Sequence, residues 1–131
     1  MKKFCLSIMF VIFFGLNVYA QTELNGDYSL VDSNIKECDF IGNAKLNINY
    51  NSIKIKANKW KWKDSSPLTK KIFKGKFKKN YTNITIIAKD MGSKHKLEGT
   101  IEDNKIFLTF SSTHEEANLR YGGCTFILAK D

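Results

Sequence analysis

The chain has 131 residues, with 21 basic and 13 acidic side chains and a formal net charge of +8 at pH 7. This length suits one globular domain behind an N-terminal leader, and it excludes two domains with separate hydrophobic cores. The excess of lysine favours partners that carry negative charge.

The N-terminus has the layout of a secretory signal peptide. Two lysines precede an almost unbroken apolar run over residues 4–16, and the small residue Ala20 follows. This layout predicts a signal peptide over residues 1–20 that is cleaved after Ala20. The apolar run is short for a membrane span, although an uncleaved anchor is the alternative. We therefore expect a mature domain over residues 21–131, secreted or periplasmic, with no membrane span.

Two cysteines remain after cleavage, Cys38 and Cys124. In an oxidising compartment they most simply pair with each other, and two free buried thiols are the alternative. No Cys-x-x-Cys motif occurs, so neither a redox dithiol nor a zinc knuckle is indicated.

The mature chain alternates apolar and polar residues with a period of two, which is the strand period. An opening strand is expected near residues 26–31. The later strands follow, in chain order, from their apolar positions: Ala44, Leu46, Ile48 and Tyr50; Ile53, Ile55 and Ala57; Phe73, Gly75 and Phe77; Ile84, Ile86 and Ala88; Leu97, Gly99 and Ile101; Ile106, Leu108 and Phe110; Phe126 and Leu128. Residues 115–119 could form one helical turn.

We therefore expect an all-β domain, a single antiparallel meander of about eight strands closed as a small barrel or a two-sheet sandwich. Closure would pair the first strand with the last and remove exposed strand edges. A bridge between Cys38 and Cys124 fits this closure, because it ties the exit of the first strand to the start of the last.

The segment Leu24–Leu30, read as LNGDYSL, resembles the Gly-x-aromatic opening of lipocalin-like domains. The family usually has tryptophan where this chain has Tyr28, and no long helix follows the strands. Small secreted META-type domains and some bacterial inhibitor proteins have a similar size and strand content. The lipocalin resemblance implies a cup-shaped barrel that holds a small apolar ligand. We expect a cavity rimmed by six aromatic side chains: Tyr28, Tyr50, Trp60, Trp62, Phe73 and Phe77.

Catalytic and metal-binding motifs are not found. The chain has no Gly-x-Ser-x-Gly elbow and no glycine-rich phosphate loop. His95 lies between two lysines, whose charge would disfavour its protonation. His114 precedes Glu115 and Glu116, but this cluster lacks a second histidine at helical spacing, so an exposed turn is the simpler interpretation. We expect no enzyme activity, no cofactor and no metal.

Residues 54–79 hold 11 lysines and one acidic residue, Asp64, and they carry the positive charge of the mature chain. Trp60 and Trp62 occupy even positions, whereas the buried residues before them occupy odd ones. A straight strand would therefore point both tryptophans outward. A bulge near Asn58–Lys59 would turn them into the core and leave the neighbouring lysines in water. The second arrangement is favoured, because burial of two large aromatic side chains is strongly stabilising.

Five lysines are expected on the exposed side of the two strands in this stretch: Lys54, Lys56, Lys74, Lys76 and Lys78. They could serve only to protect a sheet edge from pairing. Alternatively, they bind an anionic envelope polymer or an acidic protein, with a salt-sensitive and unselective affinity typical of lysine. Two hypotheses thus stand, a binding protein with an apolar ligand inside the barrel and an interaction or inhibitor protein that uses its basic face. We expect a monomer and no specific nucleic-acid partner.

Overall fold

The computed structural model describes residues 24–33, 38–77 and 82–131. The predicted signal peptide and Lys78 lie outside the described residues.

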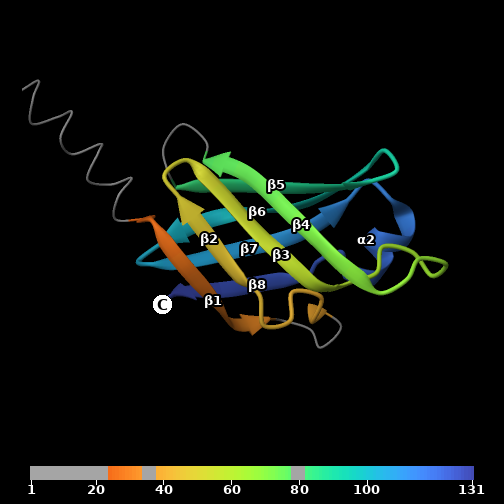
Figure 1. The fold of residues 1–131 in the computed structure, drawn as a ribbon, viewed down its shortest axis with the longest axis horizontal. Coiled ribbons are helices and arrows are strands. Elements are labelled where there is room, and N and C mark those ends of the chain that lie inside the picture. The colour runs from red at the N-terminus through yellow and green to blue at the C-terminus, as the bar shows by residue number, and fades with distance from the viewer. Residues whose placement is uncertain (1–23, 34–37, 78–81) are drawn as a thin grey trace, which may run out of the picture.

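Eight antiparallel strands close into one barrel in meander order, and each strand pairs with its neighbours in the sequence (Figure 1). The first and last strands also pair, which closes the sheet. The predicted all-β meander is confirmed, as a barrel. The elements are β1 (Gly26–Ser33), β2 (Lys45–Asn49), β3 (Ser52–Trp60), β4 (Thr69–Phe77), β5 (Asn83–Asp90), β6 (Ser93–Glu102), β7 (Lys105–Ser112), α2 (Glu115–Tyr121) and β8 (Thr125–Lys130).

The helix α2 extends the single turn expected near residue 115 and lies at one end of the barrel (Figure 1). It carries Glu115 and Glu116 in its first turn and Arg120 in its last, which is the charge order that the helix dipole favours. Ala117 and Tyr121 are its buried residues. No helix in the described part of the chain is long and apolar enough to cross a membrane.

Alternate residues of every strand point into the barrel and form one core. Its largest fully buried side chains are aromatic: Trp60, Tyr28, Phe40, Phe73, Phe110 and Phe126. Neighbouring strands come close together at two glycines inside the strands, Gly75 and Gly99. A Cβ atom on Gly99 would lie 1.7 Å from the carbonyl oxygen of Phe107, and one on Gly75 would lie 2.1 Å from that of Thr85. Any larger residue at these two positions would push the strands apart.

The alternation in β3 changes phase before its last residue. Its pairing with β4 shifts register between Ala57 and Trp60, and the Trp60 side chain is 0% exposed. The predicted bulge is therefore confirmed for Trp60. Trp62 follows the end of the strand and is half-buried against the core.

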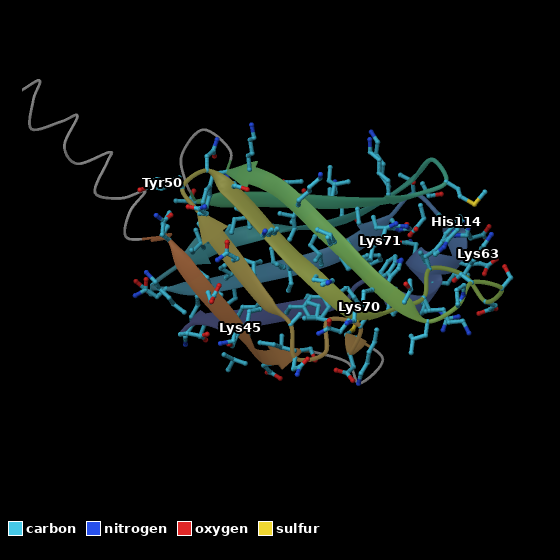
Figure 2. The ribbon with its side chains drawn as sticks, in the orientation of Figure 1. Lys45, Tyr50, Lys63, Lys70, Lys71 and His114 are labelled. Carbon is cyan, nitrogen blue, oxygen red and sulfur yellow. A yellow bond between two sulfur atoms is a disulfide. The ribbon has the colours of Figure 1, made fainter. Side chains whose placement is uncertain are left out.

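Tyr50 does not continue the inward row of β2, which corrects the sequence-based expectation. Its side chain is 59% exposed. Asn49 pairs with Ser52, so Tyr50 and Asn51 are the two central residues of a tight hairpin turn, and Tyr50 has a positive φ of 56°. This left-handed backbone turns the ring away from the barrel. Figure 2 shows Tyr50 at the end of the barrel opposite His114.

The predicted disulfide between Cys38 and Cys124 is confirmed, with 5.6 Å between the two Cα atoms. Cys124 directly precedes β8, and both cysteines belong to the core. The bridge spans 86 positions of the sequence. It thus holds the segment after β1 against the start of the strand that closes the barrel.

The double variant Cys38→Ser/Cys124→Ser should lower the free energy of unfolding by about 2–4 kcal/mol, because its unfolded chain gains the freedom that the cross-link removes. Urea unfolding followed by fluorescence measures this loss. The wild-type protein with a reducing agent is the matched control and should unfold at the same urea concentration as the variant. A variant as stable as the oxidised wild type would show that the bridge does not stabilise the barrel.

Candidate functional site

The outer side of β3 and β4 carries several exposed lysines. Four that the sequence predicts there, Lys54, Lys56, Lys74 and Lys76, are what we call the lysine face. Lys54 and Lys74 lie directly opposite each other across the two strands. Like charges in this position destabilise a sheet, so burial of the alternate apolar residues must hold the strands together. The predicted exposure is confirmed for these four lysines.

The lysine face has no acidic partners within the described residues. Some lysines elsewhere do have them. Lys45 pairs with Asp131 at 2.6 Å, and Lys59 pairs with Asp39 at 3.0 Å. The lysine face therefore keeps its full positive potential, which draws anionic groups toward it. A lysine ammonium group is a point charge and lacks the paired, planar donors of an arginine guanidinium. It therefore selects for the charge density of a ligand more than for its shape.

The six aromatic residues predicted to rim a ligand cavity do not gather around one space. Tyr28, Trp60 and Phe73 are 0% exposed and Phe77 is 9% exposed. Trp62 is half-buried, and Tyr50 points outward from a turn. The interior residues and the turn residue thus belong to different parts of the molecule.

The rings inside the barrel fill it at the α2 end. Trp60 and Phe73 have ring centroids 5.5 Å apart. Phe40, from the segment before β2, packs against Trp60 at 5.5 Å and against Phe73 at 6.3 Å. It also contacts Phe110, Tyr121 and Phe126. Phe40 therefore occupies the space between these strands, and ligand binding by the six residues stays a prediction.

A partly buried polar cluster lies beside these rings, around the carboxylate of Asp90 at the end of β5. Its Oδ2 accepts hydrogen bonds from Trp60 Nε1 at 2.9 Å and from His95 Nε2 at 3.0 Å. Its Oδ1 accepts one from Lys71 Nζ at 2.5 Å. A carboxylate only accepts, so the proton of a neutral His95 is on Nε2. Nδ1 then accepts from the Ser112 hydroxyl at 2.8 Å.

Burial is the main reason why the pKa of His95 lies below its ordinary value. The charge of Asp90 and its hydrogen bond act in the opposite direction, and Lys71 and His114 add to the lowering. Desolvation was not foreseen from the sequence, where the adjacent lysines seemed to be the cause. His95 is neutral at pH 7, and its hydrogen bonds satisfy both ring nitrogens in the core.

Asp90, His95 and Ser112 are hydrogen-bonded in series. The same series occurs in enzymes in which a carboxylate orients a histidine that activates a serine nucleophile. Two observations weigh against catalysis here. His95 is 0% exposed, and Asp90 is shared with Trp60 and Lys71. The cluster best explains how buried polar groups are satisfied at the barrel end.

This cluster was not predicted from the sequence, although the strand period contains the signal for it. His95 has the same parity as the inward Leu97, Asp90 has that of Ala88, and Ser112 has that of Phe110. His114, the other histidine, packs edge-on against Trp62 at 4.7 Å. No group of three or more metal-ligating side chains occurs in the described ranges.

Comparison with known proteins does not identify a family for this chain. No protein-family model matches the chain, and neither a curated protein nor a solved structure matches it. The barrel is consistent with a lipocalin-like fold.

The lowered pKa of His95 predicts a stability that depends on pH. Between the folded pKa and the unfolded value of about 6.5, the unfolded chain binds more protons than the folded one. The contribution of His95 to the free energy of unfolding should therefore be greatest above pH 6.5 and fall as the pH decreases below that value. Urea unfolding at several pH values measures this slope.

The variant His95→Gln should flatten this slope and should also lower stability at pH 7 by about 1–3 kcal/mol, because it disturbs the hydrogen bonds to the partly buried Asp90 and Ser112. His114→Gln removes the other histidine and is the matched control. An identical slope for His95→Gln and the wild type would contradict the assignment.

Proposed function

We propose that this is a non-enzymatic binding protein, secreted or periplasmic, that holds an anionic envelope polymer on its lysine face. The observation that carries the proposal is the absence of acidic partners around Lys54, Lys56, Lys74 and Lys76 within the described residues. Four ammonium groups on adjacent strands repel one another. They cost stability in the free protein and gain a counter-charge only when an anionic partner arrives.

The packing of the barrel supports an outer contact more than an inner ligand. Trp60 and Phe73 touch each other, and Phe40 lies against both. A molecule between these rings would have to displace well-packed aromatic side chains. The disulfide fits a location outside the cytoplasm, where oxidising conditions preserve such bonds.

The quadruple variant Lys54→Gln/Lys56→Gln/Lys74→Gln/Lys76→Gln should bind dextran sulfate at least about tenfold more weakly than the wild type, since fewer counterions are released on binding. Its affinity should also depend less steeply on the NaCl concentration. Isothermal titration calorimetry at several salt concentrations measures both quantities.

The matched control removes the same charge elsewhere, with Lys45→Gln, Lys59→Gln, Lys96→Gln and Lys105→Gln combined. Three of these four lysines pair with an acid, at 2.6, 3.0 and 3.4 Å. This control should keep most of the affinity. Equal losses in both variants would show that only net charge matters, and the proposed site would be wrong.

A further inference from the structure

The pairing of β4 with β5 stops before the two strands end. We call the unpaired stretch, residues 69–73 of β4 and 88–90 of β5, the seam. The pairing of these two strands ends at Lys74 and Ile87. Beyond this pair, β4 continues over residues 69–73 and β5 over residues 88–90 with no partner residues in the β4–β5 ladder. Both extensions still pair on their other sides, with β3 and β6. The two strands therefore splay apart as they approach the end of the barrel.

A hollow of about 680 Å³ lies over this seam. Its volume falls within the range of small-molecule sites. The apolar part of its lining is Ile72, which is 53% exposed, together with Ile87 and Ala88. Lys70, Lys74 and Lys89 also line it, and all three are exposed. The methylene stems of such lysines extend an apolar surface while their ammonium groups stay in water.

The charges of the hollow are unbalanced. No described carboxylate forms an ion pair with Lys70, Lys74 or Lys89. Lys71, the fourth lysine of the lining, closes the inner side of the seam by its contact with Asp90. The site thus combines an apolar floor with three free cations at its edge.

We propose that the seam binds a free single-chain amphiphile with an anionic headgroup. Its chain lies over Ile72 and Ile87, and its headgroup meets the ammonium groups of Lys70, Lys74 and Lys89. A purely polar anion leaves the exposed isoleucine uncovered, and an uncharged chain leaves the lysines without a counter-charge. Only a ligand with both parts satisfies both features of the lining.

Asp90 makes this seam adaptable. If the headgroup draws Lys71 outward, the carboxylate keeps its hydrogen bonds from Trp60 at 2.9 Å and from His95 at 3.0 Å. The carboxylate then loses its counter-charge, but it is 16% exposed and stays hydrogen-bonded, which reduces the cost of that loss. The ligand can therefore compete for Lys71 while the hydrogen bonds of Trp60 and His95 to Asp90 remain.

Calorimetry with sodium decanoate below its micellar concentration tests the proposal on the oxidised protein. Decanoate should bind at least about tenfold more tightly than acetate, which has the headgroup alone, or decyl glucoside, which has the chain alone. The single variants Ile72→Asn and Lys89→Gln should each weaken decanoate binding about fivefold. The amide NMR signals of residues 70–74 and 87–90 should shift on titration.

The controls lie on the outer side of β7, with Phe107→Asn as the apolar change and Lys105→Gln as the charge change. Phe107 is 39% exposed, so its replacement exposes no core. These variants should bind decanoate as the wild type does. Equal affinity for decanoate and decyl glucoside, or an unchanged affinity in Ile72→Asn, would overturn the proposal. Capture by phosphatidylglycerol vesicles without decanoate binding would also overturn it and would indicate a membrane contact.

This inference shares Lys74 with the lysine face and needs the same side of the barrel to be exposed, but it can fail alone. Ile72→Asn should leave dextran sulfate binding intact. Lys54→Gln/Lys56→Gln should weaken dextran sulfate binding and spare decanoate. If the protein binds decanoate but not dextran sulfate, the proposed function is wrong. If it binds dextran sulfate but not decanoate, the proposal for the seam is wrong.

Discussion

The carboxylate of Asp90 is the constraint on which the arrangement of this barrel depends. It accepts hydrogen bonds from three side chains that come from three different strands, Trp60, Lys71 and His95. The Asp90 side chain is 16% exposed, and a carboxylate so largely removed from water is stable only when such donors surround it. A buried indole N–H likewise needs an acceptor. Asp90 therefore makes the inward position of Trp60 favourable, beyond what the ring gains by leaving water.

The bulge that turns Trp60 inward leaves the preceding Lys59 exposed. Lys54 and Lys56 lie before the bulge and are exposed because they alternate with the buried Ile53 and Ile55. Phe40 completes the interior by packing against Trp60 and Phe73. A barrel filled in this way directs recognition to its outer surface, where the free charge and the splayed seam lie together on β4.

The sequence predicts much of this fold because most of the information is local. The period of two identifies the inward residues of the strands, and two remaining cysteines leave one pairing. The burial gained by Trp60 is large enough to indicate the bulge before it. The lysine face follows from the same alternation, so its exposure could be foreseen.

The features that the sequence does not predict depend on strand register and on loops, and the local alternation of residues does not contain this information. Ala88 pairs with His95, and only that register places Asp90 beside the histidine ring. The β4–β5 ladder ends at Lys74 and Ile87 although both strands continue, so the alternating pattern conceals the seam. Phe40 lies outside any strand, and its burial depends on how its segment folds back over the barrel end. Tyr50 continues the alternation of β2, but a two-residue turn redirects it.

The most direct test of this account is hydrogen exchange at the two tryptophan indole N–H groups, followed by NMR. The Trp60 N–H is bonded to Asp90 inside the filled barrel, so it should exchange orders of magnitude more slowly than that of the half-buried Trp62. This result would place Trp60 in a closed interior. Fast exchange at Trp60, comparable with that at Trp62, would contradict both the Asp90 contact and the filled barrel.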